Sequence, residues 1–107
     1  MRFCYLCKMR IIAFRTLREF WENPKYGDSE VPLRSWYHDV KNANWLHSND
    51  LKQQYRNASI VGEGRAVFNI KGNTYRLVVA VDYDFQVIFI RFVGTHKQYD
   101  KIDAKTI

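Results

Sequence analysis

The sequence predicts an α+β fold, an antiparallel meander sheet with two N-terminal helices packed on one face and a short C-terminal helix. Three observations predict it. An amphipathic helical pattern lies in the first half of the 107-residue chain, three apolar strand-like segments follow in the second half, and a short turn separates each from the next. Strands joined by short turns pair antiparallel, and a chain of this length suits one domain.

The first eight residues, MRFCYLCK, are expected to be an extension before a single domain that covers residues 9–107. They hold the only two cysteines, Cys4 and Cys7, with no second pair to complete a tetrahedral zinc site and no disulfide framework. Their apolar stretch is too short for the core of a signal peptide. The sequence therefore favours a cytoplasmic protein and an incidental extension before a second start at Met9, with a metal site as the weaker alternative.

A short strand and a helix are expected at the start of this domain. The strand candidate is RIIAF, residues 10–14, and the helix should begin at a capping box formed by Thr16 and Glu19. In a capping box these two side chains satisfy first-turn amides that have no partner within the helix. Asn23-Pro24 should end the helix, because proline cannot continue it.

The second helix is predicted from its cap and its apolar stripe. Asp28 and Ser29 can cap it, and Pro32 is tolerated in its first turn. Apolar residues then recur with the spacing i, i+3, i+4, i+7: Leu33, Trp36, Tyr37 and Val40. This stripe predicts packing on the sheet, and its Trp–Tyr pair is expected in the core rather than at a cofactor.

A polar connector should lead from these helices into the meander. It runs over residues 42–57, with a short helix between Ser48 and Tyr55, and Gly62 and Gly64 mark a bend after it. Three strands are expected in the meander: Arg65–Ile70, Thr74–Asp82 and Phe85–Val93. The sequence KGN, residues 71–73, forms the first turn, and a tight turn around Tyr83-Asp84 forms the second.

The net charge limits the class of partner. Seventeen lysines and arginines against eleven acidic residues give a formal charge of +6, and the pI is near 9.5. A positive field speeds encounter with phosphates, so nucleic acid or the ribosome is expected, with an acidic protein as the alternative. No apolar stretch approaches the roughly 20 residues of a membrane span, so no membrane partner is expected.

Two arginines stand alone in the apolar strands. Arg76 and Arg91 have position numbers that add to 167, the sum expected for opposite residues if the turn is centred on Tyr83-Asp84. Their guanidinium groups should then approach each other across the ladder on an open face, with a phosphate or carboxylate between them. The alternative is a pair of salt bridges to Asp82 or Asp84.

A short helix is expected directly after the last strand. Thr95 and Gln98 have capping-box spacing, so Thr95 should be the N-cap. On that helix His96 lies three residues before Tyr99 and four before Asp100, which places the three side chains on one face beside the arginines. Histidine can accept and donate a proton near neutral pH, so this face suits a phosphodiester site, although a surface histidine without catalytic duty is the alternative.

The KGN turn carries two further candidates. Lys71 and Asn73 place an ammonium and an amide at the rim of the same face. A tight turn of type I′ explains the Gly-Asn pair equally well, so both interpretations stay open.

Two stretches of the chain resemble the HigB-type toxins of the RelE/ParE toxin superfamily. Residues 68–103 resemble the C-terminal core of these toxins, and their sequence is FNIKGNTYRLVVAVDYDFQVIFIRFVGTHKQYDKID. Residues 9–45 resemble the two-helix front half, with the sequence MRIIAFRTLREFWENPKYGDSEVPLRSWYHDVKNANW. The ending THKxYD after NxYRLVV is the most specific part. The family's usual start corresponds to Met9, so the head with its two cysteines departs from the pattern.

The resemblance implies an mRNA interferase, the toxin of a type II toxin–antitoxin system. Such a toxin cleaves messenger RNA on the ribosome, needs no metal or other cofactor, and is neutralised by a HigA-like helix-turn-helix antitoxin. Operator DNA would be contacted only through the antitoxin complex. Carried over by position, the catalytic residues are Arg76, Arg91, His96 and Tyr99, and the RNA-binding residues are Lys71, Asn73 and Lys97.

The reaction that fits is attack of the RNA 2′-hydroxyl on the adjacent phosphate, with His96 or Tyr99 transferring protons and the two arginines stabilising the phosphate charge. It requires both guanidinium groups and the imidazole to face one solvent-open hollow. Two alternatives remain open at this point. One is a ParE-like toxin that acts on a topoisomerase without cutting, and the other is a nonenzymatic RNA-binding domain.

Overall fold

The computed structural model of the protein describes residues 9–62 and 64–107. The predicted extension, with Cys4 and Cys7, lies outside the described residues. In chain order the elements are β1 (Arg10–Ile12), α1 (Phe14–Glu22), the 3-10 helix η2 (Pro24–Ser29), α2 (Glu30–Lys41), α3 (Ser48–Gln54), β2 (Ser59–Val61), β3 (Arg65–Ile70), β4 (Tyr75–Asp82), β5 (Val87–Thr95) and α4 (His96–Tyr99).

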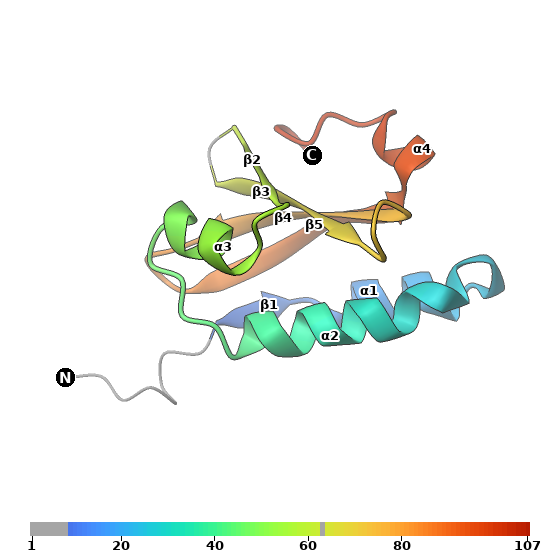
Figure 1. Ribbon diagram of the computed structural model, residues 1–107, viewed down its shortest axis with the longest axis horizontal. Coiled ribbons are helices and arrows are strands. Elements are labelled where there is room, and N and C mark those ends of the chain that lie inside the picture. Colours follow the sequence, from blue (N-terminus) through green and yellow to red (C-terminus); the bar gives the residue numbers. More distant parts are fainter. Residues whose placement is uncertain (1–8, 63) are drawn as a thin grey trace.

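The strands form one five-stranded sheet in the order β1-β5-β4-β3-β2. All neighbours are antiparallel except β1, which pairs parallel to β5. Helices α1 and α2 lie side by side on one side of this sheet, and α4 lies with the C-terminal segment on the other (Figure 1). The predicted α+β fold is confirmed. Strand β2 was not predicted, because its three residues lie between a polar connector and two glycines, whereas the equally short β1 lies within the apolar run RIIAF.

Helix α1 begins three residues earlier than the sequence predicts. Its N-cap is Ala13, which makes no side-chain cap, so the capping box of Thr16 and Glu19 is wrong. The backbone amide of Thr16 instead donates to the carbonyl of Ala13 at 3.1 Å, inside the first turn. The predicted end is confirmed, since the helix stops before Asn23.

The cap predicted for α2 is also wrong, although its apolar stripe is confirmed. Ser29 precedes the helix without capping it, because its hydroxyl donates to the carbonyl of Tyr26 at 2.7 Å. The Asp28 carboxylate is occupied by contacts with Lys71 and Tyr75. Three residues of the stripe are buried and Tyr37 is partly buried, and Pro32 lies in the first turn.

The main core lies between the sheet and the helices. Alternate residues of β4 point into it: Tyr75, Leu77, Val79 and Val81. The ring of Phe68 on β3 is its centre, with centroids 5.3 Å from the ring of Trp36 and 5.1 Å from that of Tyr55. Burying such large apolar surfaces supplies most of the free energy of folding.

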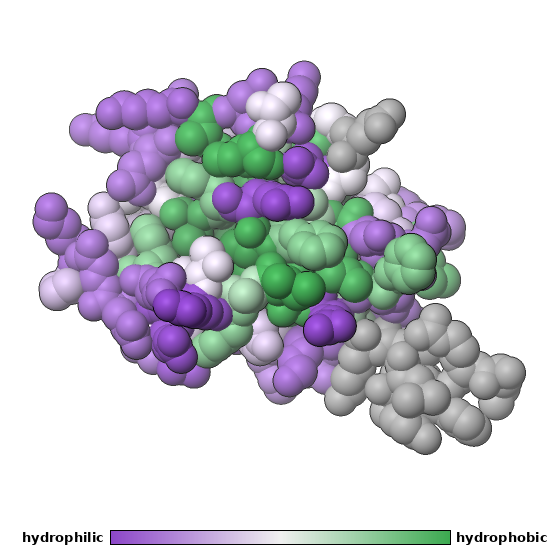
Figure 2. Space-filling model, turned by 180° about the vertical axis from the view of Figure 1, so that it is seen from behind, coloured by the Kyte–Doolittle hydropathy of each residue, from purple (hydrophilic) through white to green (hydrophobic). Residues whose placement is uncertain are grey.

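The opposite face of the sheet is only partly covered. The C-terminal segment packs there, where Val67, Val78 and Ala104 form a small second cluster. The Arg65 guanidinium fixes the end of the segment by donating to the carbonyl of Ile107 at 2.9 Å. Seen from behind, the molecule shows apolar residues across its middle and hydrophilic residues around them (Figure 2). None of the helices in the described part of the chain is long and apolar enough to span a bilayer.

The register of β4 with β5 differs from the prediction. The connection is a four-residue turn over 83–86 rather than a two-residue one, so β5 begins at Val87. Gln86 has a positive φ of 58°, and its buried side chain donates to the carbonyl of Trp45 at 2.6 Å, which fixes this longer turn. A bulge opposite Val78 and Val79 adds a further shift. Arg76 therefore pairs with Gly94 rather than with Arg91.

Candidate functional site

Arg76 is at the centre of a short row of residues across three strands. Asn69 of β3 and Gly94 of β5 are its register partners on either side. The half-buried guanidinium donates to the carbonyl of Asn73 at 3.3 Å, and its carbon lies 5.9 Å from the centroid of the Tyr99 ring. Arg76 thus connects the β3–β4 turn with α4, on the face of the sheet opposite α1 and α2.

Helix α4 has the cap that the sequence predicts. The Thr95 hydroxyl accepts from the amide of Gln98 at 3.1 Å, and the Gln98 side chain accepts from the amide of Thr95 at 2.9 Å. The same Gln98 side chain donates to the hydroxyl of Tyr26 at 3.3 Å, which ties α4 to η2. This short helix is held in place from two sides.

His96, the candidate proton-transferring residue at the start of α4, is exposed to solvent. His96 Nδ1 lies 3.2 Å from a carboxylate oxygen of Asp100, and the two side chains are 52% and 59% exposed. Tyr99 is half-buried, with its ring centroid 6.5 Å from that of Phe92. The contact confirms the prediction that His96 and Asp100 lie on one face of the helix, and one helical turn separates His96 from the Tyr99–Arg76 contact. Lys97 is exposed beside them.

Arg91 lies away from this group. It is the extra residue of the bulge, three positions from Gly94, or about 10 Å along the strand. Its guanidinium carbon lies 5.6 Å from the centroid of the Phe89 ring. The predicted side-by-side pair with Arg76 is wrong, because the prediction assumed a short turn and no bulge. A catalytic role for Arg91 stays a prediction.

The alternative for the two arginines, salt bridges to Asp82 or Asp84, is not found either. Among residues 9–62 and 64–107 no ion pair joins Arg76 or Arg91 to a carboxylate. Asp82 instead accepts from the backbone amide of Phe85 at 3.1 Å. The guanidinium charge of Arg76 is therefore available to an anionic ligand.

Lys71 has a carboxylate partner that the sequence did not indicate. Its ammonium lies 2.6 Å from Asp28, and the Tyr75 hydroxyl donates to the same carboxylate. The hydrogen bond from Lys71, followed by that from Tyr75, lowers the pKa of Asp28. Burial, with the hydrogen bond to Asp28, raises the pKa of Tyr75 to about 12. An RNA-binding role for Lys71 stays a prediction, and it would require competition with Asp28.

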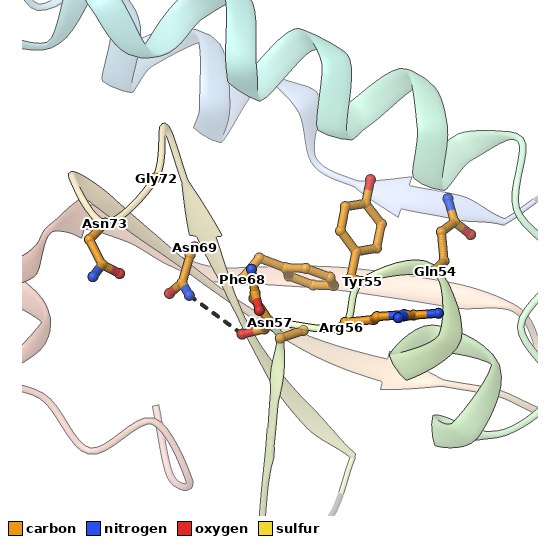
Figure 3. A pocket seen from close by; sticks show the side chains of 9 residues that line it. Gln54, Tyr55, Arg56, Asn57, Phe68, Asn69, Gly72 and Asn73 are labelled. Atoms are coloured by element: carbon orange, nitrogen blue, oxygen red, sulfur yellow. Dashed lines mark hydrogen bonds between the residues drawn. The ribbon is translucent and has the colours of Figure 1, made fainter.

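A hollow of about 530 Å³ lies beside this row. The end of β3 and the β3–β4 turn form one wall with Asn69, Gly72 and Asn73, and residues 54–58 form the other (Figure 3). Sequence reasoning proposed Asn73 but missed Asn57 and Asn69. Asn69 could have been found by extending the register of the KGN hairpin, whereas nothing local in the sequence places Asn57 nearby.

The described residues offer no cluster of three His, Cys, Asp or Glu side chains that could hold a metal ion. The arrangement instead combines a cation, a phenol and an imidazole paired with a carboxylate. These groups can bind a phosphate and transfer protons.

Comparison with protein families supplies the assignment. A family model described as HigB_toxin, the RelE-like toxic component of a toxin-antitoxin system, matches residues 29–102. The chain belongs to the HigB toxin family. In this HigB toxin the part matched by the family model runs from the start of α2 to just beyond α4, so it includes Arg76, His96 and Tyr99. No curated protein matches its sequence.

Membership has two direct consequences. A HigB toxin is one half of a toxin–antitoxin system, so it has an antitoxin partner. HigB and RelE toxins are typically ribonucleases, which agrees with the phosphate-binding and proton-transferring groups beside α4.

Proposed function

We propose that this HigB toxin is an endoribonuclease that cleaves messenger RNA on the ribosome and thereby inhibits translation. One observation carries the proposal: Arg76, which pairs with no carboxylate among the described residues, lies 5.9 Å from the centroid of the Tyr99 ring, one helical turn from the exposed His96–Asp100 pair. A phosphodiester bound by Arg76 would have a phenol and an imidazole within reach. These are the groups that internal phosphoryl transfer requires.

The reaction is a transesterification within the RNA. The 2′ oxygen forms a bond to the adjacent phosphorus, and the bond from phosphorus to the 5′ oxygen of the next nucleotide breaks. The products are a 2′,3′-cyclic phosphate and a 5′-hydroxyl. Arg76 stabilises the charge that develops on the non-bridging oxygens, and Arg91 is a second candidate for this role.

His96 and Tyr99 divide the proton transfers. The Asp100 carboxylate beside His96 stabilises the imidazolium that forms when His96 takes the proton from the 2′-hydroxyl. Tyr99 then donates a proton to the leaving 5′ oxygen. Each transfer contributes about 10²- to 10⁴-fold to the rate, and the ribosome adds to it by orienting the message.

The partners follow from this activity and from the family. The substrate complex is mRNA in the ribosome, and Lys97, Asn73 and Lys71 are the proposed additional RNA contacts. The antitoxin is a HigA-like helix-turn-helix protein, and operator DNA is bound only through its complex with the toxin. The toxin acts in the cytoplasm, and no step of the reaction involves a metal ion.

The proposal is tested by mapping 5′ ends of messages by primer extension after expression of the toxin. New ends inside codons are expected with the wild type, and His96→Ala or Tyr99→Phe should reduce them at least 100-fold. His38→Ala is the matched control, because His38 is exposed on α2, away from the site. With purified toxin and ribosomes kept in magnesium buffer, cleavage should persist when a chelator selective for transition metals is added.

Two outcomes would contradict the proposal in favour of its alternatives. Intact messages together with induction of the DNA-damage response would indicate a ParE-like topoisomerase inhibitor. RNA binding without any product, unchanged by His96→Ala and Tyr99→Phe, would indicate a nonenzymatic RNA-binding domain.

A further inference from the structure

Apart from Asn73, a proposed RNA contact, the residues that line the 530 Å³ hollow beside Arg76 have no role in the reaction described above. It exists because β2 pairs with β3 only over residues 65–67, which leaves the edge of β3 open from Phe68 onward. The segment before β2 forms the facing wall. Lys52 fixes that segment, because its ammonium donates to the carbonyls of Arg56 at 2.8 Å and Ala58 at 2.6 Å.

The walls of the hollow suit a nucleobase. Four side-chain amides line it, from Gln54, Asn57, Asn69 and Asn73. An amide carries both a donor and an acceptor, the combination that reads the edges of bases. The Gln54 carbonyl oxygen already accepts from the Trp45 indole at 3.0 Å, so the three asparagine amides are the candidates for base contacts. The other lining groups include two aromatic residues and Arg56, and none of the described residues that line it is acidic. Its volume lies within the range of about 300–1,000 Å³ that is usual for small-ligand sites.

The amide wall is directly connected to Arg76. Asn69 is the register partner of Arg76 on β3, and neighbouring strands are about 4.8 Å apart. The carbonyl of Asn73 accepts the hydrogen bond from Arg76. In Figure 3 Asn57 and Asn69 lie next to each other, joined by a hydrogen bond of 3.4 Å from the Asn69 amide to the Asn57 carbonyl. The Tyr55 hydroxyl points instead towards α2.

We propose that this hollow binds one nucleobase of the RNA beside the scissile phosphate, and that Asn57 and Asn69 set the base preference of cleavage. The inference rests on the proposed function and names the part of the substrate that the hollow receives. A phosphate held by Arg76 leaves the neighbouring base within reach of the hollow, and hydrogen bonds from two amides distinguish one base from the others.

The first experiment compares cleavage patterns of the wild type, Asn57→Ala, Asn69→Ala and the control Asn49→Ala. Asn49 is exposed on α3 and does not line the hollow. Mapped 5′ ends from a message pool should show a base preference beside the cut in the wild type and the control. Each pocket variant should reduce that preference about fivefold or more, since a paired base contact discriminates by about 1–3 kcal/mol. Unchanged preference in both pocket variants would overturn the inference while leaving the ribonuclease proposal intact.

The second experiment detects binding without cleavage. In a His96→Ala background, which keeps the phosphate-binding Arg76, the side-chain amide signals of Asn57 and Asn69 are followed by NMR during titration with the four nucleoside 5′-monophosphates. Larger shifts with one base than with the others are expected. If the variant shows such shifts but the wild-type toxin cuts no message, the base-binding site stands and the ribonuclease proposal is wrong. Signals that respond only to the antitoxin would mark a protein-binding site and overturn the inference.

Discussion

The two faces of the central strand β4 have different compositions. On the helix side Tyr75, Leu77, Val79 and Val81 are all buried in the main core. On the other side the middle of the strand is buried but its ends carry half-buried charges, Arg76 at one end and Asp82 at the other. One face therefore supplies folding free energy along its whole length. The other face places the Arg76 guanidinium, which has no carboxylate partner within residues 9–62 and 64–107, where the strand meets α4, so stability and chemistry can be changed separately.

Of the substitutions that test this difference between the two faces, Leu77→Ala on the core face should have the largest effect, a loss of stability. Leu77 is 0% exposed, and removing its buried methyl groups leaves a cavity. The free energy of unfolding should fall by about 2–5 kcal/mol, measured by urea denaturation. Leu46→Ala is the matched control, because Leu46 is 53% exposed and should change stability by only about 0.5 kcal/mol. Equal losses for both variants would contradict the packing described for this face.

The next effect should come from Arg76→Ala on the open face. The ribosome-dependent cleavage rate should fall about 10²- to 10³-fold, as when one donor to a developing oxyanion is removed. The urea midpoint should stay close to that of the wild type.

Arg91→Ala tests whether Arg91 contributes less to cleavage than Arg76. Because Arg91 lies three residues before Gly94, the partner of Arg76 on β5, its removal should cost less activity than that of Arg76. An equal loss for both variants would show that the arginines act on one phosphate despite their separation.

A smaller effect is expected from Gly94→Ala, opposite Arg76. An added Cβ would lie 2.6 Å from both Gln98 Oε1 and Phe92 Cζ, so the cap of α4 and the ring must move. Unfolding free energy should fall by about 1–3 kcal/mol, with a matching loss of cleavage as α4 shifts. Gly27→Ala is the control, because its added Cβ meets nothing closer than 4.0 Å. A variant with wild-type stability and activity would contradict the close packing of α4 on β5.

The smallest effect is the pH dependence contributed by Asp28. Its pKa in the folded protein lies below the ordinary value of 3.8, mainly because of the hydrogen bond from Lys71. The contribution is therefore fully present above about pH 4 and is lost as the pH falls through the lowered pKa. Asp28→Asn should lose less stability on acidification than the wild type, by a small amount because the pair is exposed. Urea midpoints at pH 7 and pH 3 measure this, with Asp84→Asn as control. Identical pH profiles would indicate that the contact with Lys71 does not persist in solution.

Local patterns in the sequence were sufficient for much of the fold. The stripe of Leu33, Trp36 and Val40 gave α2 and its buried face, because residues three and four apart lie on one side of a helix. The capping-box spacing of Thr95 and Gln98 predicted the start of α4, because the two residues that form the cap are only three positions apart. Where a capping side chain found a distant partner instead, as Asp28 did, the local pattern was misleading.

The sequence by itself determined the α+β fold, the helix that carries His96 and Tyr99, and the charge of Arg76. Only the tertiary structure decided which residue lies opposite Arg76, because one longer turn and one bulge shift every pair beyond them. It also decided that Asn57 and Asn69 share a hollow, since they come from segments whose approach no local pattern encodes. Helical spacing is a property of neighbouring residues, whereas strand register and pockets depend on contacts between distant parts of the chain.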